Sequence, residues 1–411
     1  MNKVNLGLVL SISCVYGFYP INMFGELVGY VGMGVSIFVK TALIFLSCIS
    51  LFVCFSKLSS RKFVFFIAFT FFLFFIYFIR LCYDWAFQFD SLGLEVDGSW
   101  YVMTYITMTV APVFSFLIIV RYYDRHVFFN VVTVLSIIAA FSALVLFRNY
   151  ISNEVEGFGP RLSTVKTNPI SLGAFFVTSA IITWCYLLDG SIDNIKKYLC
   201  SFLLFFYFIL VILSGSRGAL ASLIGVVVTY LIFCSESKKR FIFMIVISCL
   251  LSLSLSMIIS LSHLLFGDID FFRGYLNVGA SDDLSAMIRI GAYENAISQF
   301  VQNPIFGDLS LERVTRFYPH NVFIDILMSL GIMGGVVYAI YIALVFYMSI
   351  KVMRLKGIGI IVSLLWLQQF YGLLFSSSIF QTYFFWAYSI SLGAIYLNPI
   401  LKKQMCQEIF K

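Results

Sequence analysis

The stretch FVFFIAFTFFLFFIYFI, residues 63–79, is an apolar run without a single charged side chain. Continuous apolarity of this length, without polar alternation, is typical of a membrane-crossing helix. Across all 411 residues 61% are hydrophobic and 11% are charged, whereas a soluble domain carries about 25% charged residues. Backbone groups in lipid need internal partners, so these runs are expected to be helices. The predicted fold class is an all-α polytopic membrane protein.

We expect about twelve transmembrane helices in a single integral membrane domain, residues 1–411. The second run is too long for one straight span, and 21–40 could hold a re-entrant piece. The first run lacks a convincing cleavage site and is interpreted as a retained helix, with a signal peptide as the lesser alternative. The runs are 4–20, 30–56, 63–81, 99–120, 127–147, 169–188, 198–214, 218–234, 241–263, 321–350, 358–376 and 380–400.

Basic residues set the expected orientation, because cytoplasmic loops are enriched in Lys and Arg. If Lys3 is inside, alternate loops on that side hold 17 of the 27 basic residues, and 12 of these 17 are Lys. The opposite loops hold most of the acids. We therefore expect a multi-pass inner-membrane protein with both termini cytoplasmic.

The basic residues on the predicted outer side are mostly Arg, which topology does not require. A guanidinium group grips phosphate oxygens with two parallel hydrogen bonds, so the set favours an anionic ligand on that face. The alternative is that these residues pair with outer acids or lipid headgroups. The outer set is Arg80, Arg148, Arg161, Lys166, Arg217, Arg273, Arg289, Arg313 and Arg316.

The longest outer segment, residues 264–320, is predicted to be a large periplasmic loop. Its part from Asp282 to Val301 has apolar residues at helical spacing and should form an amphipathic helix at the membrane interface, ended by Asn303-Pro304. Arg289 lies beside the apolar face. Asn321 is the expected N-cap of the next helix, whose positive end would favour a phosphate.

Two further polar residues stand at the predicted outer edge. Arg217 lies in the hairpin Leu213–Ala219, where Gly and Ser explain a turn but nothing explains a charge at the edge of hydrocarbon. His320 directly precedes Asn321. A lone His at a helix start is commonly a capping or packing residue, but its predicted face is shared with Arg217 and Arg289. No Cys/His cluster or acidic motif indicates a metal.

These motifs together resemble the O-antigen polymerase and ligase family. The resemblance rests on the hairpin 214–219, on RIGAYE at 289–294 with NPIFG at 303–307, and on His320-Asn321 followed by glycines at 331, 334 and 335. Pro160-Arg161 with Asn168-Pro169 is also similar to the family. The match covers about 160–335.

The resemblance implies a GT-C-like membrane glycosyltransferase that uses glycan carried on undecaprenyl pyrophosphate, on the periplasmic side and without a metal or cofactor. It assigns His320 as the base that activates the acceptor hydroxyl, and Arg217 and Arg289 as the residues that stabilise the leaving pyrophosphate. Arg161, Asn321 and Tyr293 are candidate substrate-binding residues.

Three functions remain open at the level of sequence. A polymerase, which we favour, moves the growing chain onto another lipid-linked repeat unit, whereas a ligase moves the finished chain onto lipid A core. A polysaccharide flippase or other transporter is less favoured, because no internal repeat is evident and the polar motifs gather at the outer edge. Expected partners are the lipid-linked glycan donor and acceptor and a chain-length regulator protein, with no nucleic acid.

Overall fold

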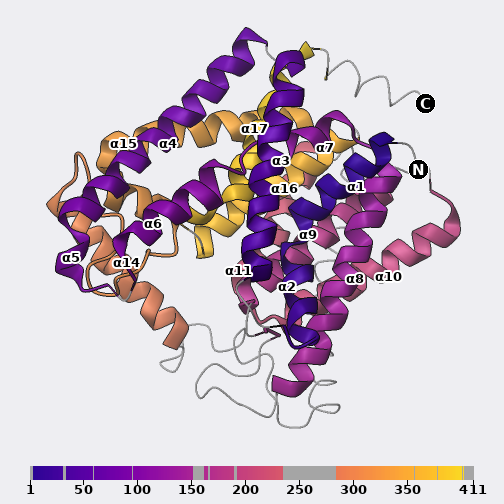
Figure 1. The fold of residues 1–411 in the computed structure, drawn as a ribbon, viewed down its shortest axis with the longest axis horizontal. Helices are drawn as coiled ribbons and strands as arrows, with labels where there is room; N and C mark the ends of the chain where they lie inside the picture. The colour runs from indigo at the N-terminus through magenta and orange to yellow at the C-terminus, as the bar shows by residue number, and fades with distance from the viewer. Residues whose placement is uncertain are drawn as a thin grey trace. The chain divides into compact units, whose positions relative to one another are not determined.

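The computed structural model describes residues 3–30, 34–58, 60–94, 96–150, 162–164, 167–188, 192–234, 284–355, 357–376, 378–399 and 401. Every regular element in these ranges is a helix, which confirms the all-α fold class (Figure 1). The chain divides into two compact units. The first unit comprises Met1–Phe18, Met33–Val132 and Ile288–Lys411, and the second comprises Tyr19–Gly32 and Thr133–Met287.

Eight helices of the described ranges are long and apolar enough to cross a membrane, and a ninth results if the bent pair α1 (Lys3–Tyr16) and α2 (Phe18–Leu27) is one span. The protein is thus a multi-pass membrane protein. The run predicted at 241–263 lies outside the described residues. The eight are α3 (Gly34–Leu58), α4 (Arg61–Phe87), α8 (Arg125–Tyr150), α9 (Pro169–Leu188), α10 (Asn194–Leu213), α11 (Arg217–Cys234), α15 (Val322–Met353) and α16 (Ile358–Ser376).

The run predicted as one span at 99–120 is divided into three helical pieces. They are α6 (Gly98–Tyr105), the π-helical turn η1 (Ile106–Val110) and α7 (Leu117–Arg121). Pro112 lies between η1 and α7 and has no N–H to continue a helix. The Ala111 N–H donates to the Ile106 carbonyl at 2.8 Å, five residues back, and turns follow until α7 begins.

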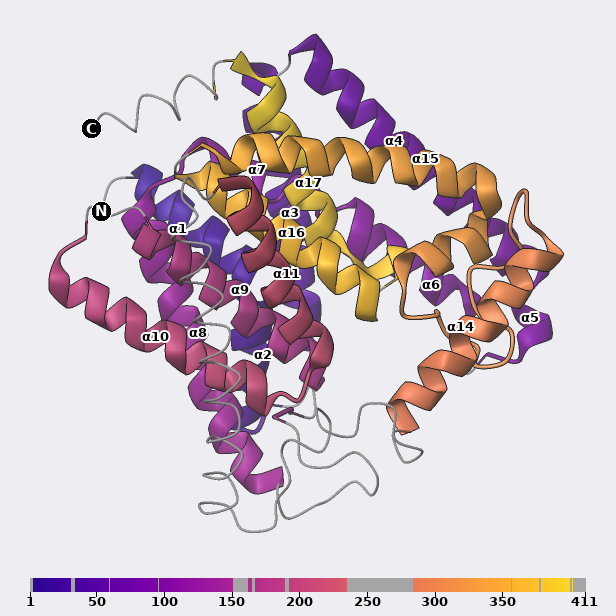
Figure 2. The same cartoon turned by 180° about the vertical axis from the view of Figure 1, so that it is seen from behind.

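The core of the first unit is aromatic. α4 lies beside α15 and contacts the short apolar helix α17 (Tyr383–Leu397) (Figures 1 and 2). Trp386 is buried, with ring centroids of Phe74 at 4.6 Å and Tyr341 at 5.3 Å. A Cβ at Gly393 would meet the Phe66 ring at 2.5 Å, so this glycine allows α17 to approach α4 closely.

The second unit is built around α9, which packs against both α10 and α11. In the α9 span 72% of the residues are buried, whereas in the α10 and α11 spans the buried shares are 33% and 22%. Tyr207 of α10 stacks on Phe176 of α9, with 6.4 Å between the ring centroids. The more exposed apolar faces of α10 and α11 suit contact with lipid.

Candidate functional site

The start of α15 is fixed by Asn321. Its side-chain oxygen accepts hydrogen bonds from the backbone N–H groups of Phe323, at 3.0 Å, and Ile324, at 3.3 Å. This confirms the predicted N-cap. The Asn321 side-chain N–H donates to the Leu374 carbonyl at 3.1 Å, which ties the start of α15 to the end of α16.

His320 immediately precedes this cap in a left-handed backbone conformation, with φ of 55°. Such a conformation is uncommon outside glycine and often marks a functional site. The imidazole is half-buried, and the Tyr318 ring lies edge-on to it at 4.7 Å. The His320 Nδ1 is buried and has no hydrogen-bond partner among the described residues.

Arg289 on α14 (Leu284–Gln302) supplies positive charge near His320. Burial, and then the charge of Arg289, lower the pKa of His320 to about 4. Burial raises the pKa of Tyr293, one turn further along α14, and Arg289 opposes this effect. Arg289 is half-buried and makes no ion pair within the described part of the chain. The structure therefore brings Arg289, Tyr293 and His320 into one neighbourhood, while their roles stay predictions.

The amphipathic helix predicted at 282–301 corresponds to α14, and it ends before Asn303-Pro304 as expected. Its predicted start at Asp282 lies outside the described residues. Ala292, Ala296 and Gln299 form the buried face, whereas the predicted apolar face is largely exposed. Exposed apolar side chains suit a helix at the membrane interface, a placement that stays a prediction.

The segment after α14 packs onto a break in α15. Gly331 interrupts the helix with φ of 62°, and the loop supplies partners for the freed backbone groups. The Ile332 N–H donates to the Pro304 carbonyl at 2.8 Å, and the Asp308 N–H donates to the Met328 carbonyl at 2.8 Å. A Cβ at Gly307 or at Gly331 would collide with the facing backbone. The 303–307 motif and Gly331 thus form one contact that no larger residue allows.

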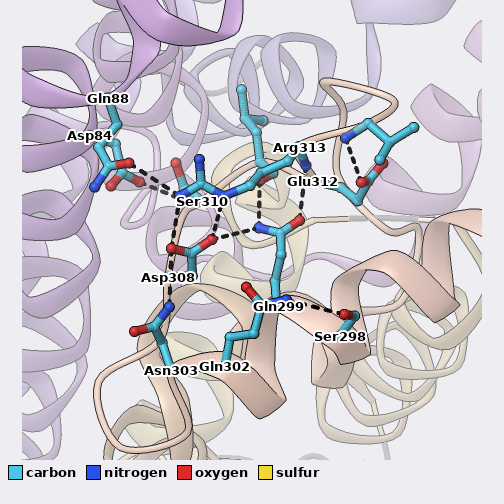
Figure 3. A network of polar contacts seen from close by, with 12 residues as sticks. Asp84, Gln88, Ser298, Gln299, Gln302, Asn303, Asp308, Ser310, Glu312 and Arg313 are labelled. Carbon is cyan, nitrogen blue, oxygen red and sulfur yellow. Dashed lines mark hydrogen bonds and ion pairs between the residues drawn. The ribbon is translucent and has the colours of Figure 1, made fainter.

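Asp308 is the centre of the polar network in Figure 3. Arg313 binds it with two hydrogen bonds, Nε to Oδ2 at 2.7 Å and Nη2 to Oδ1 at 2.8 Å. Gln299 and Asn303 donate to the same carboxylate at 3.2 Å and 3.3 Å. Burial favours a higher pKa for Asp308, but the hydrogen bonds and charge of Arg313, followed by the Gln299 hydrogen bond and the charge of Arg80, bring it below the ordinary value. Asp308 therefore stays charged and anchors the loop to the end of α14.

A second acid, Asp84 near the end of α4, holds the same loop. Its Oδ2 accepts the Ser310 N–H at 2.8 Å (Figure 3). Its Oδ1 lies 2.9 Å from the Arg80 Nε. Arg316 donates to the Gly93 carbonyl at 2.8 Å. Pairing within the protein, the alternative to ligand binding, is therefore what the structure shows for Arg80 and Arg313.

Arg217 lies in the second unit, as the first residue of α11. The hairpin turns at Gly215, with φ of 61°, and the Ser216 hydroxyl accepts the Ala219 N–H at 3.3 Å, so Ser216 caps the helix. The Leu162 N–H donates to the Leu213 carbonyl at 2.8 Å, which places Leu162, the residue after Arg161, against the hairpin. Arg161 itself lies outside the described residues.

Residues 202–307 match the family model described as O-antigen ligase. This match confirms the predicted resemblance to the O-antigen polymerase and ligase family. It includes Arg217, Arg289 and Tyr293, whereas His320 and Asn321 lie beyond its end. No curated protein matches the chain.

The sequence interpretation missed three acids that the structure makes prominent: Asp84, Asp308 and Asp325. Asp84 and Asp325 are completely buried in α4 and α15. The signal was present for Asp325, which lies inside the predicted run 321–350, because an ionisable residue inside an apolar run is a functional hypothesis by default.

Proposed function

We propose that the protein is an O-antigen polymerase, a glycosyltransferase of the bacterial inner membrane. It moves a glycan chain from undecaprenyl pyrophosphate onto a lipid-linked repeat unit, on the periplasmic side. The observation that carries this proposal is a half-buried Arg289, with no acidic partner among the described residues, near a neutral His320 at the start of α15. The positive charge of Arg289 favours binding of an anion, and the neutral imidazole of His320 can accept a proton.

Arg289 serves the leaving group. As the bond between the sugar C1 and the pyrophosphate oxygen breaks, negative charge grows on that oxygen, and a fixed guanidinium stabilises it. Arg217 is proposed for the same task on the evidence of its sequence motif. Tyr293 and Asn321 are proposed to contact the glycan or its phosphates.

His320 serves the acceptor. The acceptor hydroxyl oxygen forms the new bond to C1, and its proton passes to the imidazole, while undecaprenyl pyrophosphate leaves with the electron pair of the broken bond. A pKa of about 4 makes free His320 a weak base. Donor binding would place negative charge beside Arg289, oppose its effect on His320 and raise the basicity of the imidazole when substrate is present.

A ligase is the second candidate, because the matching family model carries that description. Ligase and polymerase use the same donor chemistry and differ in the acceptor. The decisive test is deletion of the gene followed by gel analysis of the surface polysaccharide. A polymerase mutant should carry core with one repeat unit, since ligation continues.

Other outcomes would replace the proposal. Bare core with long chains left on undecaprenyl pyrophosphate would identify a ligase. A mutant in which no lipid-linked repeat reaches the periplasm would identify a flippase.

A dependence of chain length on a separate regulator protein would support the proposed partner.

A further inference from the structure

Asp325, one turn into α15, is a buried carboxylate with one unused oxygen. Its Oδ2 accepts hydrogen bonds from the Ser378 hydroxyl at 2.7 Å and the Ile379 N–H at 3.1 Å. Its Oδ1 is buried and has no partner among the described residues. Burying a carboxylate is costly unless its oxygens are satisfied, so this half-satisfied acid calls for an explanation.

Other buried polar atoms around Asp325 lack partners too. They include the phenol oxygens of Tyr77 on α4 and Tyr338 on α15, and the His320 Nδ1, beside the Tyr318 ring, also has no partner among the described residues. Asp325 acts electrostatically on both phenols and also on Tyr318, whose ring contacts His320. Several unsatisfied groups in one polar region favour a chain of hydrogen bonds through internal water.

We infer that Asp325 is the positioning residue of His320: its free oxygen accepts a hydrogen bond from an internal water, and the His320 Nδ1–H donates to that water. This inference rests on the proposed function. Which ring nitrogen of a histidine is free is set by the hydrogen bond that the other nitrogen makes. With its proton held on Nδ1, His320 presents the Nε2 lone pair to the acceptor hydroxyl.

The arrangement also accounts for the proton after transfer. The acceptor hydroxyl gives its proton to Nε2, so the imidazole becomes a cation with protons on both nitrogens. The Asp325 carboxylate stabilises that cation through Nδ1, as the acid that orients the base does in the catalytic triads of other enzymes. The imidazolium forms despite repulsion from the positive charge of Arg289. A negative charge near the imidazolium is therefore of most use at that step.

Asp325→Asn separates this role from a structural one. The amide oxygen can still accept from Ser378 and Ile379, but the side chain has lost its charge and cannot stabilise the imidazolium. We expect melting close to wild type and a loss of polymerisation of about tenfold or more. Asp90→Asn, at an exposed carboxylate of α5 (Phe89–Leu92), is the matched control and should leave polymerisation unchanged.

A double variant tests whether Asp325 acts through His320. In a His320→Gln background, Asp325→Asn should cause little further loss, because the residue that it positions is already gone. An equal loss in both backgrounds would reveal a structural role and overturn the inference. Polymerisation by Asp325→Asn at the wild-type rate would overturn it as well.

A size-matched pair keeps the test decisive if Asp325→Asn does not fold. Asp325→Glu and Asp325→Gln differ in charge rather than volume, and the Glu variant should be about tenfold the more active. Equal activity of the pair would contradict the inference while leaving the proposed function intact. Inactivity of the wild-type protein with a donor on undecaprenyl pyrophosphate would overturn both.

Discussion

Arg289 on α14 and His320 at the start of α15 are electrostatically coupled, although 31 positions separate them in the sequence. Burial is the larger cause of the low His320 pKa of about 4, and the Arg289 charge adds to it. The imidazole is therefore neutral at pH 7, and it gains a proton only as the pH falls through 4. A neutral imidazole is the form that accepts a proton in the proposed reaction.

Replacement of Arg289 by Gln should raise the pKa of His320. The value should stay below the ordinary 6.5, because burial remains. An NMR titration of the imidazole in micelles measures it, in a His126→Gln, His263→Gln background that leaves His320 as the sole histidine. Arg289→Lys is the control: it keeps the charge and should keep the pKa near 4. An unchanged pKa in the Gln variant would show that burial acts alone.

Charge alone should not restore transfer. We expect Arg289→Lys and Arg217→Lys to insert normally and to lose most polymerisation, because Lys lacks the planar fork that binds a phosphate through two parallel hydrogen bonds. Arg354→Lys, at an exposed arginine after α15, serves as the control for a general effect of the exchange. Polymerisation at the wild-type rate by both Lys variants would reduce the two residues to generic positive charge.

The sequence predicts the described fold well because the strongest determinant of a membrane helix, a long apolar run, is local. It also predicts the cap at Asn321 and the end of α14 at Asn303, since both depend on near neighbours. The break of the 99–120 run was predictable in principle from Pro112. The mean apolarity of the run favours a single span, but Pro112 cannot continue a helix.

The contacts of the candidate site could not be predicted in the same way. The pairing of Asp84 with Ser310 joins positions 226 residues apart, and the Gly307–Gly331 contact depends on a loop folding back onto a broken helix. The outer arginines illustrate the limit, because composition treats them alike. The structure separates Arg313, which is held by Asp308, from Arg289, which has no such acid within the described ranges.

The acid Asp84 should matter for stability more than its place in an apolar helix suggests. Asp84→Ala would leave the Arg80 side chain, which is 13% exposed, without this partner and would free the Ser310 N–H. Breaking a buried pair in this way costs about 3 kcal/mol or more. Thermal unfolding in detergent should therefore shift clearly downward. Asp90→Ala, at an exposed acid, should barely change it, and equal shifts would argue against the pair.

The orientation of the chain is a separate prediction, from the distribution of Lys and Arg. Reporter fusions at 57–62, 121–125 and 238–240 and at the C-terminus should report a cytoplasmic location. A fusion near Asn303 should report a periplasmic one. A cytoplasmic result for Asn303 would place Arg289 on the wrong side of the membrane for a lipid-linked donor and would remove the mechanism.

The role of His320 as a base can be separated from its other possible roles, because Asn321 already caps α15. What remains is a choice between proton acceptance and a hydrogen bond to pyrophosphate. His320→Asn is the sharpest substitution, since Asn tolerates the left-handed backbone at this position and its amide can donate a hydrogen bond but cannot act as a base.

We expect His320→Asn to insert, to bind donor and to lose about 100- to 10,000-fold in chain transfer, the usual contribution of general-base catalysis. His320→Gly, which also accepts the backbone conformation, controls for strain and should be similarly inactive. The measurement is polymerisation in purified membranes with donor in excess. Near-normal transfer by His320→Asn would show that the imidazole donates to phosphate and that the acceptor proton leaves by another route.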